Sequence, residues 1–123
     1  MKLAQVALGV QDLARATAFY TELLGYPPVG IFDPPGLVFF DLDGVRLLLE
    51  VGAPATLLYL QVDSVREQVR ELRGRGTPVV EEPHVIFRHA DDALGPAGTD
   101  EWMAFVRDSE DNLLGLASHE PGE

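Results

Sequence analysis

The sequence has no cysteine, which excludes disulfides and thiolate chemistry and leaves the redox compartment open. Basic residues are also scarce: the sequence has nine Lys and Arg residues and 20 Asp and Glu residues, which gives a net charge of -11. This balance argues against nucleic acid and anionic membranes as partners. No segment approaches the roughly 20 apolar residues of a spanning helix, and Met1–Gln5 starts no apolar run with a cleavage site. We therefore expect a cytoplasmic protein.

Several catalytic motifs are missing as well. The sequence contains no Gly-x-Ser-x-Gly, no P-loop and no dinucleotide-binding glycine pattern. Gly74-Arg75-Gly76 is too short to indicate phosphate binding and is better interpreted as the end of a helix. Acyl transfer by a nucleophilic serine, P-loop chemistry and dinucleotide binding thus have no support.

Alternating and helical apolar patterns predict one strand, one helix and several further strands in the first half. Asp12 is a predicted helix N-cap and Gly25 a helix stop. Asp43-Gly44 is a two-residue hairpin signal. The predicted strands of this half are Leu3–Val10, a short edge strand at Val29–Phe32, Leu37–Leu42 and Val45–Val51.

The pattern then begins again. Ser64-Val65-Arg66-Glu67 has the form of a capping box, and Val65, Val69 and Leu72 form a helical stripe. The predicted strands of this half are Leu57–Val62, Pro78–Glu82, Glu101–Arg107 and Leu113–Ser118. We expect a mobile loop from His84 to Asp100 and fraying from Glu120 to Glu123.

The two halves form an internal repeat. A shift of 52 residues places Val6, Leu8 and Val10 on Leu58, Leu60 and Val62, while a shift of 67 aligns the last strands. We therefore predict one α+β domain over residues 1–123, with βαβββ modules at about 1–52 and 56–119. The two sheets are expected to join into one curved mixed sheet with helices outside and a cup inside.

Glu50 is a charged residue in an otherwise mostly aliphatic predicted strand, and its position there requires an explanation. It lies in the aliphatic strand Val45–Val51, on the face shared with Arg46 and Leu48. A carboxylate in a sheet requires a cation, a metal or water, so this face is expected to line the cup. Glu50 could pair with Arg46 or stay wet at the rim, or act as a general base if it is shielded.

The sequence resembles the vicinal-oxygen-chelate superfamily, which includes glyoxalase I, methylmalonyl-CoA epimerase, extradiol dioxygenases and bleomycin-resistance proteins. Val10-Gln11-Asp12-Leu13, Phe19-Tyr20 and Leu24-Gly25 are similar to its opening. Val62-Asp63, Gly76, Glu82-Pro83 and the segment Phe105–Leu113 are similar to its second half. The resemblance implies the fold and a homodimer, but it does not specify a reaction.

Members of this superfamily place metal ligands on cup-facing strand positions. The resemblance assigns these positions to Gln5, to Leu48 or Glu50, to Leu57, and to Gly115 with Ala117 beside it. Two of these four ligand positions, Leu57 and Gly115, therefore carry no metal-binding side chain, whereas a catalytic metal ion needs about three protein ligands. No metal is favoured; if a divalent metal binds, Gln5, Glu50 and His84 are its predicted ligands.

The histidines have ordinary interpretations beside this one. His84 and His89 are five residues apart and share a face only if the chain bends between them; each is otherwise a loop or surface residue. His119 is expected to be solvated near a fraying terminus.

Several other side chains are candidate ligand contacts that also have ordinary structural interpretations. Arg46 could bind an anion or neutralise Glu50, and Gln5 could bind a ligand or pair within the core. Tyr59 could aim its hydroxyl into the cup, and Trp102 could form a stacking wall or belong to the core. Phe39, Phe40 and Phe87 are ambiguous in the same way.

Three functions remain open. The first is binding of a small, partly apolar organic molecule without an intact family metal site, favoured by the apolar cup positions Leu48, Leu57, Leu113 and Ala117. The second is a divalent-metal-dependent lyase, epimerase or dioxygenase. The third is a metal-free acid–base enzyme with Glu50 as base.

Overall fold

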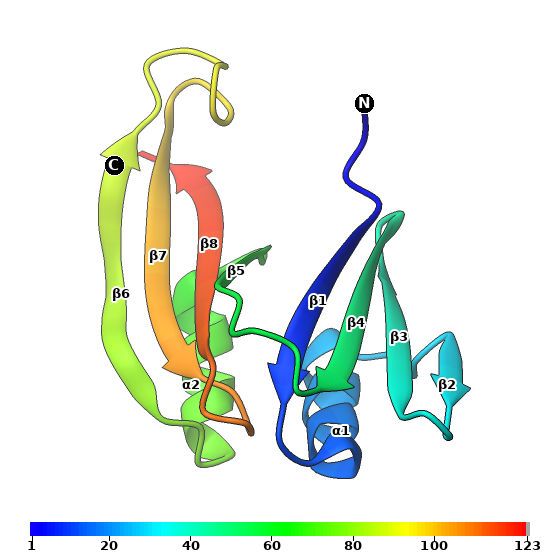
Figure 1. Cartoon of the computed structure of the whole chain (residues 1–123). Helices are drawn as coiled ribbons and strands as arrows, with labels where there is room; N and C mark the ends of the chain where they lie inside the picture. The colour runs from blue at the N-terminus through cyan, green and yellow to red at the C-terminus, as the bar shows by residue number, and fades with distance from the viewer. Residues whose placement is uncertain (123) are drawn as a thin grey trace. The chain divides into compact units, whose positions relative to one another are not determined.

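A computed structural model describes residues 1–122 and divides the chain into two compact units (Figure 1). The first module comprises Met1–Thr56 together with Ser109–Asn112. The second module comprises Leu57–Asp108 and the chain from Leu113 onward. Each module has one helix and four strands in the order βαβββ, so the predicted repeat and the α+β fold class are confirmed. The joining of the two sheets into one cup stays a prediction.

The first module is a four-stranded mixed sheet with a helix on one face. Its strands lie in the order β1-β4-β3-β2, and only the β1–β4 pair is parallel. Parallel pairing of β1 and β4 requires a crossover, part of which is the helix. The elements are β1 (Gln5–Val10), α1 (Leu13–Leu24), β2 (Gly30–Phe32), β3 (Leu37–Leu42) and β4 (Val45–Val51).

Helix α1 begins and ends where the sequence predicts. The Asp12 carboxylate accepts a hydrogen bond from the Arg15 backbone N–H, and the Gly25 N–H donates to the Thr21 carbonyl. The buried side of α1, with Ala16 and Tyr20, packs on β3 and β4. The sheet residues buried on this side are Leu8, Val10, Val38, Phe40, Leu47 and Leu49. The opposite face is therefore the one that carries Gln5, Arg46 and Glu50, as strand alternation predicts.

The second module repeats this plan. Its strand order is β5-β8-β7-β6, with β5 and β8 parallel. The Ser64 hydroxyl accepts from the Glu67 backbone N–H, and Val65, Val69 and Leu72 form the buried stripe of the helix. The elements are β5 (Leu58–Gln61), α2 (Val65–Gly74), β6 (Val79–Arg88), β7 (Thr99–Arg107) and β8 (Leu113–Pro121).

Three strands are longer than predicted, and one of them, β7, begins at Thr99 instead of Glu101. Strand β6 continues to Arg88, so His84 lies in a strand and the connection to β7 is shorter than the expected loop. Pro83 is tolerated because β6 is an edge strand whose pairing with β7 has register shifts around it.

Strand β8 continues to Pro121, which pairs with Thr99, so the expected fraying at Glu120 is wrong; Glu123 lies outside the described residues. The prediction failed because this pairing partner is distant in sequence. Among residues 1–122, no helix is long and apolar enough to cross a membrane.

Candidate functional site

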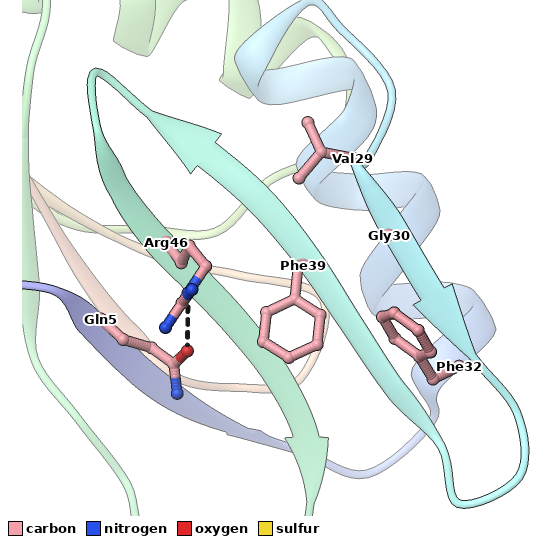
Figure 2. A pocket seen from close by; sticks show the side chains of 6 residues that line it. All are labelled: Gln5, Val29, Gly30, Phe32, Phe39 and Arg46. Carbon is pink, nitrogen blue, oxygen red and sulfur yellow. Dashed lines mark hydrogen bonds between the residues drawn. The ribbon is translucent and has the colours of Figure 1, made fainter.

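A cavity of about 410 Å³ lies on the first module's sheet. It is lined by Gln5 of β1, Arg46 of β4, Phe39 of β3, and the segment Val29, Gly30 and Phe32 at β2. Figure 2 shows the Gln5 and Arg46 side chains at one side of the site and the two phenylalanine rings at the other. The sequence therefore provides one polar and one apolar wall on the face opposite α1.

Arg46 and Gln5 form the polar wall. They are register partners in the parallel β1–β4 pair, and the Arg46 Nε–H donates to Gln5 Oε1 at 3.0 Å. Within residues 1–122, the Arg46 guanidinium makes no other hydrogen bond and no ion pair. Since a guanidinium has five N–H groups, four of them remain available to a ligand.

Phe32 and Phe39 form the apolar wall. Their rings meet edge to face, with centroids 5.8 Å apart and planes at 82°. Edge-to-face packing is a favoured arrangement of aromatic rings and keeps part of each face accessible. Phe32 is more than half exposed, so this wall is open to solvent and to a ligand. Leu48 is the cross-strand partner of Phe39 on the same face of the sheet, and its side chain is buried.

The structure does not bring Gln5 and Glu50 together. Gln5 pairs with Arg46, whereas Glu50 pairs with Gly9, four residues further along the strands. Four residues of a strand span about 13 Å, so the Glu50 side chain leaves the sheet well away from those of Gln5 and Arg46. Within the described part of the chain, Glu50 has no ion pair. The interpretation that Glu50 pairs with Arg46 is therefore wrong.

The predicted site residues of the second module lie in different surroundings. His84 Nε2 is 3.3 Å from Glu81 Oε1 on the exposed surface of β6. Leu57 precedes β5 and is exposed. The Tyr59 ring covers Gly115, its register partner, where an added Cβ would lie 2.7 Å from Tyr59 Cδ1. The side chain of an aspartate or glutamate at position 115 would thus clash with the Tyr59 ring unless the ring moved.

Trp102 is not on the face predicted for a ligand wall. It shares its side of β7 with the buried residues Ala104 and Val106, and the Arg66 guanidinium of α2 lies 4.0 Å from its ring centroid. Strand alternation explains the result, because positions 102, 104 and 106 all face the helix. Trp102 therefore packs against α2 through a cation–π contact.

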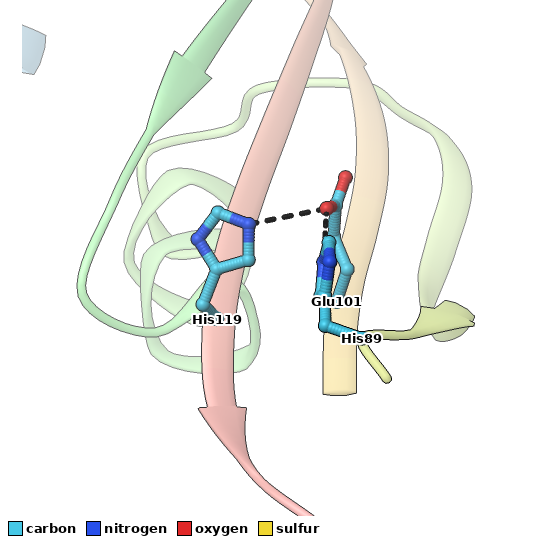
Figure 3. A group of neighbouring side chains, drawn as sticks. All are labelled: His89, Glu101 and His119. Carbon is cyan, nitrogen blue, oxygen red and sulfur yellow. Dashed lines mark hydrogen bonds and ion pairs between the residues drawn. The ribbon is translucent and has the colours of Figure 1, made fainter. Parts of the chain in front are cut away.

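A second polar group lies in the second module and was not predicted. His89 and His119 both contact the same oxygen, Glu101 Oε1, with Nε2 distances of 2.8 and 3.1 Å (Figure 3). His89 lies in the connection after β6, as the loop interpretation has it, but it is buried, so the interpretation of this residue as a surface histidine is wrong. The His119 side chain is 17% exposed, and its expected solvation near a fraying terminus is also wrong. The available signal was the spacing of Gly115, Ala117 and His119, which share one face if β8 continues.

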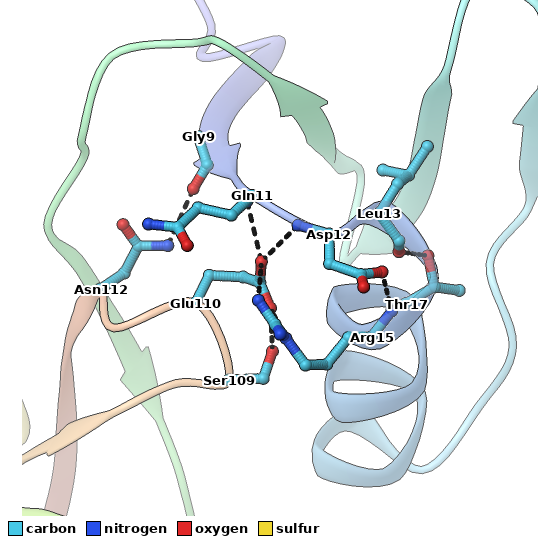
Figure 4. A network of polar contacts seen from close by, with 9 residues as sticks. All are labelled: Gly9, Gln11, Asp12, Leu13, Arg15, Thr17, Ser109, Glu110 and Asn112. Carbon is cyan, nitrogen blue, oxygen red and sulfur yellow. Dashed lines mark hydrogen bonds and ion pairs between the residues drawn. The ribbon is translucent and has the colours of Figure 1, made fainter.

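Glu110 anchors the turn before β8 to the start of α1 (Figure 4). Its Oε1 accepts the Gln11 and Asp12 backbone N–H groups at 2.8 and 2.7 Å, and its Oε2 accepts Arg15 Nε–H at 2.7 Å and the Ser109 hydroxyl at 2.9 Å. Burial raises the pKa of Glu110, but these hydrogen bonds outweigh it and hold the pKa at about 2. Both oxygens of this carboxylate therefore accept hydrogen bonds that stabilise the fold.

The positions that the family resemblance assigns to a metal do not offer a suitable donor set. Leu48, Leu57 and Gly115 have no side-chain donor, the Gln5 oxygen accepts from Arg46, and the Glu50 carboxylate lies four residues further along the strands. His84 contacts Glu81 and the Glu82 carbonyl instead. Within residues 1–122, the donors that the structure does bring together are those of His89, Glu101 and His119.

Comparisons with known proteins agree with the fold. No curated protein matches this sequence. The solved structure of lactoylglutathione lyase from Agrobacterium tumefaciens is 21% identical, with 95% of this chain and 92% of that chain covered and a TM-score of 0.70. A glyoxalase-related enzyme from Fulvimarina pelagi is 20% identical, with 96% and 88% covered and a TM-score of 0.68. At these identities the likeness establishes the fold alone.

The family itself is established by a sequence model. The model of the Glyoxalase/Bleomycin resistance protein/Dioxygenase superfamily matches residues 2–114, nearly the whole chain. The repeated βαβββ module and the strand order of both sheets agree with this match. The chain therefore belongs to the Glyoxalase/Bleomycin resistance protein/Dioxygenase superfamily.

Proposed function

We propose that this chain binds a small organic anion with an apolar or aromatic body in the first-module cavity, without the metal ligands of the family positions. The observation that carries the proposal is the pairing of two walls on one sheet face. Arg46, held by Gln5, offers free N–H groups, and Phe32 and Phe39 offer ring surface. Most small-molecule sites combine a largely apolar lining with a few placed polar groups.

The volume supports a small ligand. About 410 Å³ lies near the lower end of the range of about 300 to 1,000 Å³ that is typical of small-molecule sites. Such a space suits a molecule with one or two rings and a short polar group. The openness at Val29 and Phe32, which are both exposed, favours a ligand that enters and leaves without rearrangement of the sheet.

The charge of the ligand follows from Arg46. Its planar guanidinium can donate two parallel N–H bonds to a carboxylate or phosphate, and these charge-assisted bonds are stronger than neutral ones. The Gln5 contact orients the guanidinium through Nε, which leaves the terminal nitrogens for the ligand. A neutral ligand of the same shape would make fewer and weaker bonds.

A solution experiment tests the proposal with matched probes. Small aromatic acids, such as benzoate and 3-phenylpropionate, are titrated into ¹⁵N-labelled protein, and the corresponding primary amides serve as neutral controls. We expect the acids to shift the backbone resonances around Gln5, Gly30 and Phe39 and to bind about tenfold or more tightly than the amides.

Matched variants identify the residue responsible. Arg46→Gln should weaken binding of the acids by about tenfold and that of the amides much less, because it removes the positive charge together with three of the five N–H donors. Arg73→Gln in α2 is the control, since Arg73 pairs with Glu82 on the surface of the other module. Equal affinity for acids and amides, or shifts confined to the second module, would contradict the proposal.

A further inference from the structure

Three strands of the second module bring His89, Glu101 and His119 to one point. Glu101 of β7 and His119 of β8 are cross-strand register partners, and His89 directly follows β6. Their ligating atoms all lie within 4.8 Å of one another. Two imidazole nitrogens and one carboxylate oxygen form a donor set that is known for catalytic zinc sites. None of the three residues occupies a ligand position that the family resemblance assigns.

The distances suit a tetrahedral ion with little movement. Donors about 2.0 to 2.2 Å from a tetrahedral Zn²⁺ lie about 3.4 Å apart. The His89–Glu101 and His119–Glu101 separations are 2.8 and 3.1 Å, so outward shifts of about 0.6 and about 0.3 Å bring these two pairs to that spacing, and the ligating nitrogens of the two imidazoles lie within 4.8 Å of each other. Both Nε2 atoms point at one carboxylate oxygen (Figure 3), and rotation about the side-chain bonds supplies shifts of this size.

The surroundings hold the three side chains in place. The His89 N–H donates to the Thr99 carbonyl at 2.9 Å, and the Gly98 N–H donates to the His89 carbonyl at 2.8 Å. The Phe87 ring packs edge to face on the His89 ring, with centroids 4.9 Å apart. Side-chain exposure is 1% for His89, 19% for Glu101 and 17% for His119. The group is thus largely shielded from water, with its accessible side at Glu101 and His119.

Gly95 allows the β6–β7 connection to approach this group. A Cβ added at position 95 would lie 2.7 Å from His119 Nε2 and 3.0 Å from His89 Cε1. Those separations are shorter than normal contacts, so any larger residue would push the backbone or the rings away. The absence of a side chain at this position brings the connection close to the two imidazoles.

We propose that His89, Glu101 and His119 bind one divalent transition-metal ion, Zn²⁺ fitting best, with a fourth position open to water or a ligand. Three protein donors with one open position distinguish this site from a closed structural zinc site. The alternative is a metal-free arrangement in which both imidazoles donate N–H bonds to Glu101. The proposal is independent of the first-module cavity, so either can fail alone.

Calorimetric titration of the chelator-treated 123-residue chain with ZnCl₂ tests the site. We expect one ion per chain. Glu101→Gln and His119→Gln should each weaken binding by about 100-fold or more, since the loss of outer partners alone costs 10- to 100-fold. His84→Gln is the matched control, because His84 also contacts a carboxylate at 3.3 Å, and its effect should be below about twofold.

Three outcomes would overturn the proposal: no binding by the wild type at about 1 mM Zn²⁺, unchanged affinity in both Glu101→Gln and His119→Gln, or loss of binding in His84→Gln. A second measurement needs only the wild-type protein, so it tests the site even if the variants do not fold. Zn²⁺ should shift the ¹⁵N ring resonances of His89 and His119 and leave those of His84 in place. Unchanged His89 and His119 resonances in the presence of Zn²⁺ would equally reject the site.

Discussion

Replacement of Glu110 by glutamine should destabilise the fold strongly. The Glu110 side chain is fully buried, and its two oxygens accept bonds from two backbone N–H groups, the Arg15 guanidinium and the Ser109 hydroxyl. An amide has only one acceptor oxygen, and its NH₂ group would face donors. The variant therefore loses the charge and leaves some of these donors without an acceptor.

The size of this destabilisation follows from the pKa of the Glu110 carboxyl group. The ordinary carboxyl pKa of 4.5 falls to about 2 in the folded chain, because the hydrogen bonds from Arg15, Asp12, Gln11 and Ser109 outweigh the effect of burial. Since each pKa unit corresponds to about 1.4 kcal/mol, ionised Glu110 contributes about 3 kcal/mol to the free energy of unfolding. The folded-state pKa is the lower one, so this contribution is complete well above pH 4.5 and is lost as the pH falls toward 2.

Urea unfolding of the wild type and of Glu110→Gln from pH 7 to pH 3 measures both effects. We expect a difference of about 3 kcal/mol at pH 7 that shrinks steadily below about pH 5. Glu82→Gln is the control: Glu82 also pairs with an arginine, Arg73, but on the surface, and exposed ion pairs contribute little. A pH-independent difference, or equal effects of the two substitutions, would refute the reasoning.

Two further substitutions test the packing of each module. Leu47→Ala, at a buried site of β4 beneath α1, should lower the free energy of unfolding by about 2 to 5 kcal/mol, with an unchanged urea m-value; a loss below about 1 kcal/mol would show that Leu47 is not in a tightly packed core. Gly115→Ala should displace the Tyr59 ring from Phe105, whose centroid lies 5.9 Å away, and cost about 1 kcal/mol. A double-mutant cycle with Tyr59→Ala checks this, because the cost should largely disappear once the ring is gone, and full additivity would contradict it.

Local patterns were sufficient to predict most of the fold. The Asp12 and Ser64 caps, the Asp43-Gly44 hairpin and the alternation of apolar residues depend on neighbours in sequence, and the structure confirms them. The helix-facing and opposite faces of β4 also follow from alternation alone, which placed Arg46 on the face that bears the cavity.

The candidate sites depended on long-range pairing, which the sequence reveals poorly. Alternation placed Gln5 and Glu50 on one face, but the β1–β4 register separates them by four residues. The predicted strand Pro78–Glu82 ends before Pro83, whereas β6 continues to Arg88, because an edge strand tolerates proline.

The same limit concealed the histidine group. His119 meets Glu101 only because β8 continues along β7 beyond the predicted end. His89 reaches them because β6 continues beyond Pro83 and shortens the connection to β7. No local motif marks these three positions as neighbours.

The crystal structure of the protein soaked with 3-phenylpropionate tests the proposed function most directly. The carboxylate should lie within hydrogen-bond distance, about 2.7 to 3.2 Å, of the terminal nitrogens of Arg46. Its ring should pack against Phe32 and Phe39, while Gln5 keeps its bond to Arg46 Nε. Density for the acid at any other place, with the first-module cavity empty, would contradict the proposal.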